Sequence, residues 1–152
     1  MAKVLIVYHS MSGNTEAAAR AVAEGVKQVE GVEVILKEAM KATVDDLLEC
    51  DAIAIGTPDY FSYMAGALKD FFDRTFYPTH GKVNDKPYFA FVTHGGGGRA
   101  LESVERIANA FNFKKAVEPV LVKGRPDEKA EAKLMEAGRK LAEVAKERSR
   151  PL

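Results

Sequence analysis

The best candidate for chemistry in this sequence is a run of hydrogen-bond donors that follows the first apolar segment. It consists of Ser10-Met11-Ser12-Gly13-Asn14-Thr15 and precedes a helical pattern. Because a helix N-terminus carries partial positive charge and unpaired N–H groups, it can hold a phosphate without a basic side chain. The run therefore predicts a phosphate loop, with simple helix capping by Ser12 or Asn14 as the alternative. It lacks the Walker A spacing, which argues against nucleoside triphosphate hydrolysis.

A second loop, residues 56–66, is rich in aromatic side chains where a short polar turn would suffice. Its predicted ligand contacts are Thr57, Pro58, Asp59, Tyr60 and Phe61. We expect Tyr60 and Phe61 to cover a flat apolar ligand. Met64 begins a helical stripe and is expected to be a core residue.

A third loop contains four consecutive glycines, which cost backbone entropy that an ordinary turn does not require. A ligand lying against bare main chain would explain them, and the predicted contacts are Thr93, His94, Gly95, Gly96 and Gly97. The spacing of Gly95, Gly97 and Ala100 also satisfies a dinucleotide fingerprint, in which case Lys123 and Arg125 would meet a 2′-phosphate. The following strand ends in Lys123 instead of an acid, which disfavours that alternative.

The surrounding pattern predicts the elements that position these loops. Short apolar runs at residues 3–8, 32–36, 52–55, 88–93 and 116–122 alternate with helical patterns. Thr43 and Asp46 match a capping box at the start of a short second helix. Five strands and five helices in strict alternation predict a parallel sheet covered on both faces, in one domain spanning 1–152. In the strand order 2-1-3-4-5, the loops after strands one, three and four converge at the switch point.

Composition excludes several classes of function. The chain has 152 residues, 47% of them hydrophobic, and 22 basic residues balance 22 acidic ones. This balance gives no reason to expect nucleic acid as a partner, and no apolar run reaches membrane-spanning length, so membrane insertion is not expected. The single cysteine, Cys50, excludes an internal disulfide and a multi-cysteine metal site, and no metal site is predicted. We expect a cytoplasmic protein.

The first loop resembles the flavodoxin family, whose phosphate loop reads Ser/Thr-x-Ser/Thr-Gly-x-Thr. The resemblance covers essentially the whole chain, and it implies a flavodoxin-like three-layer α/β fold of the short-chain form. It also implies that Ser10 to Thr15 hold the phosphate of FMN while the other two loops enclose its ring. Residues 56–71 and His94 with its glycines also resemble the flavodoxin-like NAD(P)H:quinone reductases, which implies a homo-oligomer as a further possibility.

These observations predict an FMN-binding redox protein that transfers electrons to a partner protein. The alternative is an enzyme that takes hydride from NAD(P)H and reduces a quinone or a free flavin. A flavin-free module that binds another phosphate ligand is a third possibility. Asp59 and His94 are the expected tuners of the flavin potential, and His9 and His80 are expected to be structural.

Overall fold

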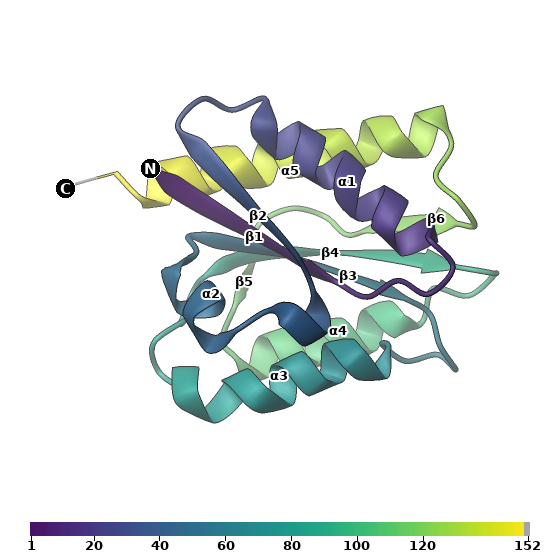
Figure 1. Ribbon diagram of the computed structural model, residues 1–152, viewed down its shortest axis with the longest axis horizontal. Coiled ribbons are helices and arrows are strands. Elements are labelled where there is room, and N and C mark those ends of the chain that lie inside the picture. The colour runs from purple at the N-terminus through teal and green to yellow at the C-terminus, as the bar shows by residue number, and fades with distance from the viewer. Residues whose placement is uncertain (151–152) are drawn as a thin grey trace.

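Residues 1–150 are described in a computed structural model, and their strands form one parallel sheet (Figure 1). The path β2-β1-β3-β4-β5 confirms the order expected from the sequence. Residues 151–152, which the predicted domain includes, lie outside the described residues. The strands are β1 (Ala2–Tyr8), β2 (Val32–Glu38), β3 (Ala52–Pro58), β4 (Pro87–His94), β5 (Lys114–Lys115) and β6 (Val120–Lys123).

The helices form a layer on each face of the sheet (Figure 1). One core lies under α1 (Asn14–Lys27) and α5 (Glu128–Arg148). The other lies under α2 (Val44–Glu49), α3 (Gly66–Thr79) and α4 (Ala100–Ala110), and the 3₁₀ helix η1 (Ala39–Lys41) adjoins it. The central strands are buried on both faces, which explains their continuous apolar sequences. No helix within residues 1–150 has the length and apolarity needed to cross a bilayer.

The last part of the sheet differs from the prediction. Instead of one strand over residues 116–122, two short pieces pair with β4. The Ala116 N–H still donates to the Tyr88 carbonyl at 2.9 Å, and residues 117–119 leave the ladder between the two pieces. Lys114 and Lys115 of β5 lie beside the start of β4, and β6 lies beside its end. Pro119 has no N–H to donate to a ladder, which gives a physical reason for the interruption. The prediction of a single fifth strand was therefore wrong.

The short helix α2 is held at both ends. Its capping box is confirmed, because the Asp46 N–H donates to Thr43 Oγ1 at 3.1 Å and the Thr43 N–H donates to Asp46 Oδ2 at 2.9 Å. At the other end, the buried Lys86 ammonium donates to the carbonyls of Leu47 and Cys50, each at 2.7 Å. Such contacts satisfy carbonyl groups that a helix terminus leaves unpaired. Burial raises the pKa of the Cys50 thiol to about 11.

Two glycines allow α1 and α5 to pack closely. A Cβ on Gly25 would collide with the backbone carbonyl of Met135, and a Cβ on Gly138 would collide with that of Val22. Because neither glycine has a side chain, the backbones of α1 and α5 are in direct contact. This packing supports α1, whose N-terminus faces the candidate site.

Candidate functional site

The phosphate loop presents an uncapped helix N-terminus. Gly13 is the N-cap of α1, with φ of 98°, and among residues 1–150 no side chain caps the first turn with a hydrogen bond. The N–H of Gly13 itself donates to Ser10 Oγ at 3.1 Å, which stabilises the bend of the loop. The helix-capping alternative for Ser12 and Asn14 is therefore wrong, because neither side chain caps α1. The unpaired N–H groups and the helix dipole suit an anion.

Glycine at position 13 is required by conformation and not by space. A Cβ there would have no heavy atom within 4 Å, but φ of 98° is strained for any residue with a side chain. Met11, one of the predicted contacts, is 78% exposed, and Ser12 is also exposed. The loop thus offers its polar groups and one apolar side chain to the outside of the molecule.

A pair of buried hydroxyls joins the phosphate loop to the third loop. Thr15 Oγ1 lies 2.7 Å from Thr93 Oγ1, and both side chains are buried. Two hydroxyls carry two protons, and their mutual hydrogen bond uses one of them. The second proton is available for a ligand acceptor. The residues predicted from separate loops are therefore brought together by the fold.

The aromatic loop is a tight hairpin with its tip in solvent. Tyr60 and Tyr63 exchange two backbone hydrogen bonds of 3.0 Å, and Phe61 and Ser62 between them have φ of 57° and 63°. Two consecutive left-handed residues are typical of a type I′ turn, which usually contains glycine or asparagine. Phe61 is fully exposed. Backbone strain that presents an apolar ring to solvent is consistent with a ligand-covering position.

The base of this hairpin is fastened by polar side chains. Asp59 Oδ1 accepts a hydrogen bond from the Ser62 N–H at 2.9 Å. Thr57 is fully buried, and its hydroxyl donates to the carbonyl of Pro58 at 2.7 Å and accepts from the Ala65 N–H at 2.9 Å. Through these two hydrogen bonds, Thr57 holds the loop in place.

The start of the next helix is anchored in the same region. Met64 is buried, which confirms its expected core position. Its N–H donates to Ser103 Oγ at 3.0 Å, and Ser103 Oγ donates to the carbonyl of Ala100 at 2.6 Å. This chain of bonds joins the aromatic loop to α4.

The glycine loop is open at two positions where the chain itself does not require glycine. At Gly95 and Gly96 a Cβ would meet no atom within 4 Å, and neither residue has a positive φ. Gly98 differs, because it has φ of 69° and a Cβ there would lie 3.4 Å from the His94 ring. Neither packing nor conformation accounts for glycine at 95 and 96. A group outside the chain that approaches this backbone would account for it.

Two side chains lie between the aromatic and glycine loops. Asp59 Oδ2 is 3.5 Å from the N–H of Ala100, at the start of α4. The Nδ1 atom of His94 is buried, and within residues 1–150 it has no hydrogen-bond partner. A buried nitrogen without a partner is costly, and a ligand acceptor or donor would satisfy it.

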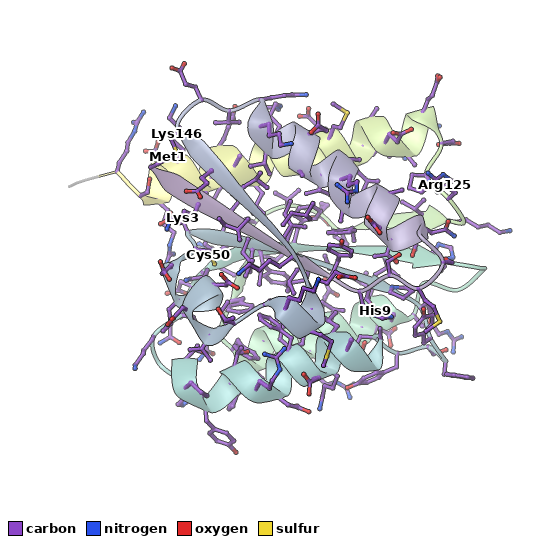
Figure 2. The ribbon with its side chains drawn as sticks, in the orientation of Figure 1. Met1, Lys3, His9, Cys50, Arg125 and Lys146 are labelled. Atoms are coloured by element: carbon purple, nitrogen blue, oxygen red, sulfur yellow. The ribbon has the colours of Figure 1, made fainter. Side chains whose placement is uncertain are left out.

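The structure also adds a residue that the sequence did not indicate. His9, expected to be structural, lies with its ring edge-on to Tyr60, with 6.1 Å between ring centroids. Its place directly after β1, whose end adjoins the switch point, was the signal that could have found it. Figure 2 shows His9 and Arg125 at the end of the molecule opposite Met1 and Lys146.

The observed topology weakens the dinucleotide alternative. A sheet in the order 2-1-3-4-5 has its switch point between β1 and β3, at the phosphate loop. The glycine loop follows β4 and therefore flanks this point instead of forming it. The uncapped α1, the exposed Phe61, the bare Gly95 and Gly96 and the unpartnered His94 nitrogen all fit FMN, with a phosphate at one side and a flat ring at the other.

Comparison with known proteins shows the family to which the chain belongs. The family model described as NADPH-dependent FMN reductase matches residues 33–122, more than half of the chain. The chain belongs to this family. It is thus a member of a flavodoxin-like family of redox proteins, and membership implies that it binds FMN. The matched residues include the aromatic and glycine loops but not the phosphate loop, whose assignment depends on its geometry and on the whole-chain likeness reported below.

Individual relatives support the same fold. A curated flavodoxin from Aquifex aeolicus (strain VF5) is 36% identical over 115 residues, which are 74% of this chain and 62% of the relative. The chain therefore matches less than two thirds of that relative's length. A solved flavodoxin from the domain Archaea has a TM-score of 0.83 at 26% identity, covering 95% of this chain and 99% of that one. The flavodoxin, WrbA-like protein from Agrobacterium tumefaciens has a TM-score of 0.82 at 23% identity, covering 98% of this chain and all of the other, and supports the fold alone.

Proposed function

We propose that this protein binds one FMN non-covalently at the carboxyl edge of its sheet and transfers electrons through it to a redox partner. The observation that carries the proposal is the convergence of three loops from β1, β3 and β4. The Thr15–Thr93 hydroxyl pair joins the first loop to the third, and the Asp59 N–H, which donates to the Thr93 carbonyl at 2.9 Å, joins the second loop to the third. Phe61 is exposed, and the backbone of Gly95 and Gly96 is open.

In this proposal the loops divide the cofactor between them. The N–H groups of α1 and the hydroxyls of Ser10, Ser12 and Thr15 hold the phosphate, with Met11, Gly13 and Asn14 completing the loop. Tyr60 and Phe61 cover one face of the ring, and residues 93–97 border its other side. Bound FMN supplies the one- and two-electron chemistry, and the side chains position the ring and tune its potential.

Asp59 and His94 have complementary roles in the proposal. The unpartnered His94 Nδ1 supports a hydrogen bond to the polar edge of the ring. Asp59 is already engaged with the N–H of Ser62, so its charge stays near the ring without needing a ligand contact. A histidine donor favours added negative charge on the ring, whereas a nearby carboxylate opposes it.

The second candidate function is an FMN-dependent reductase that uses NADPH. The description of the family, NADPH-dependent FMN reductase, favours it. NADPH would deliver hydride at the open side near Gly95 and Gly96, and a quinone or a free flavin would take the electrons. A homo-oligomer is part of this second candidate, because the short connection between α3 and β4 leaves no extended wall for a substrate. For either function we propose a cytoplasmic location, for which the support is that the chain has one cysteine, Cys50, and so no internal disulfide.

One anaerobic experiment tests the proposal and separates the two functions. The protein is first titrated with FMN, and absence of binding would refute both functions. NADPH is then added to the loaded protein while the flavin absorption band is followed. Slow or no bleaching by NADPH, with rapid electron transfer to a redox protein after dithionite reduction, supports the carrier. Rapid bleaching that a quinone reverses supports the reductase and overturns the carrier.

A further inference from the structure

A row of unpaired cations leads along the outside of the molecule to the candidate site. Lys129, Lys133 and Lys140 lie on one face of α5, because they are spaced by four and seven residues. Lys123 ends β6, and Arg125 follows in the turn to α5. All five are exposed, and within residues 1–150 none forms a salt bridge or a side-chain hydrogen bond.

These cations line two adjoining hollows between α5 and the edge of the sheet. The larger has a volume of about 690 Å³, the smaller about 280 Å³, and Val120, Lys129 and Lys133 border both. The floor of the larger one is apolar where the chain leaves the sheet, at Val117 and Pro119. We call this combined feature the basic groove. Its apolar floor and charged rim distinguish it from an ordinary solvated helix face.

The acidic residues of the basic groove do not neutralise it. Asp127 accepts a hydrogen bond from the Ala130 N–H at 2.8 Å, as the cap of α5. Glu136 pairs with Arg139, which also pairs with Glu143 at 2.9 Å, so Glu136 is not free to neutralise the lysines but this cluster adds no net positive charge. Glu118 and Asp127 have no ion pair among the described residues, so two carboxylates stand against the five unpaired cations. In a chain whose charges cancel overall, this is a local positive field.

The basic groove ends at the candidate redox site. Lys123 pairs in register with His94 across β6 and β4, and the Gly124 N–H donates to the His94 carbonyl at 2.9 Å. In Figure 2, Arg125 lies at the same end of the molecule as His9, opposite Lys146. A partner seated in the groove would therefore be brought next to the glycine loop.

We propose that the basic groove docks a redox partner protein through an acidic segment that carries apolar side chains. This inference rests on the proposed redox function and adds the chemistry of the partner. From Lys129 to Lys140 the row extends over 11 residues of helix, roughly 16 Å at 1.5 Å per residue, before it continues to Lys123 and Arg125. One phosphate group would occupy only part of that length. An extended acidic segment matches the row, and its apolar side chains match the floor.

The test uses two forms of one electron acceptor that differ in charge. Native cytochrome c is basic, whereas cytochrome c with succinylated lysines is acidic and keeps the same haem. Binding to the FMN-loaded protein is measured at low ionic strength. The rate at which one electron passes from the dithionite-reduced protein to the ferric haem is measured separately. We expect the acidic form to bind more tightly and to be reduced faster, and added salt to diminish the difference.

Matched charge reversals locate the effect. Lys129→Glu/Lys133→Glu changes two cations of the basic groove. The control, Lys82→Glu/Lys146→Glu, changes the net charge equally at two exposed lysines outside the groove. We expect the groove variant to lose at least tenfold in affinity and rate toward acidic cytochrome c, and the control variant to lose less than threefold. Equal losses in the two variants, or preference of the wild type for native cytochrome c, would overturn the proposal.

Two further measurements exclude other occupants. If the groove variant loses affinity for phosphatidylserine vesicles or for NADPH while its binding of acidic cytochrome c is unchanged, the groove serves a membrane or a nucleotide and the proposal is wrong. Binding of acidic cytochrome c is also measured with FMN-free protein. Groove-dependent binding without electron transfer would support the docking surface and refute the redox function. Equal rates of electron transfer to acidic cytochrome c in the wild type and the groove variant would support the redox function and refute the docking surface.

Discussion

Substitution of Gly95 by alanine separates ligand binding from folding. In the structure a Cβ at position 95 meets no atom within 4 Å, and the backbone has no positive φ there. The apoprotein should therefore tolerate the methyl group. A Gly→Ala change at a compatible position alters the free energy of unfolding by about 0.4–1 kcal/mol in the stabilising direction, through the unfolded state.

The cost should appear only when FMN is bound. If the ring or its ribityl chain lies against this backbone, the added methyl group overpacks the contact, which typically costs about 1–3 kcal/mol. At about 1.4 kcal/mol per factor of ten, the dissociation constant for FMN should rise roughly 5- to 150-fold.

The assay is a fluorescence titration of FMN with the apoprotein, paired with urea unfolding of the same sample. Gly66→Ala is the matched control, because Gly66 is also exposed, has open space at its Cβ and has no positive φ. An FMN affinity within twofold of wild type for Gly95→Ala would refute the reasoning, provided that the apoprotein is as stable as expected.

Two other changes test the interior. Thr93→Val leaves the buried Thr15 hydroxyl without its partner, so the free energy of unfolding of the apoprotein should fall by about 1–3 kcal/mol. Urea unfolding measures this change. A change below about 0.5 kcal/mol would show that the hydroxyl pair is unimportant for stability. Burial raises the pKa of Cys50 from 9.0 to about 11. The thiol in the folded protein stays protonated after the thiol in the unfolded chain ionises. Its contribution to the free energy of unfolding is therefore complete below pH 9 and is lost toward pH 11. Wild type should lose about 1.4 kcal/mol more stability than Cys50→Ala between pH 7 and pH 10, in denaturant unfolding at each pH, and parallel pH profiles would contradict the assigned burial effect.

Much of the fold was readable from local patterns. Continuous apolar runs identify strands buried on both faces, and Thr43 with Asp46 identifies the start of α2. The fifth strand was misjudged, because an apolar run does not show where the chain leaves a sheet. The positions of the three loops were readable for a similar reason, because each directly follows a strand; which of their residues contact FMN stays a prediction.

The tertiary structure decided how the predicted residues divide their work. Thr57 is buried and supports its loop, and His9 lies with its ring edge-on to Tyr60, contacts that only the folded chain shows. Whether a glycine serves the chain or leaves room outside it depends on neighbours that are remote in sequence, as Gly138 beside Val22 shows in contrast to Gly95.

The sequence by itself determined the order of strands and helices and the positions of the three loops, which depend on local periodicity and on residue types placed directly after strands. The cofactor class came from the resemblance to the flavodoxin family. The tertiary structure alone joined Thr15 to Thr93 and placed Lys123 beside His94. It also brought the lysines of α5 into one groove with the interrupted edge of the sheet. Such contacts depend on chain crossovers, which bring together residues whose separation in sequence carries no record of their proximity.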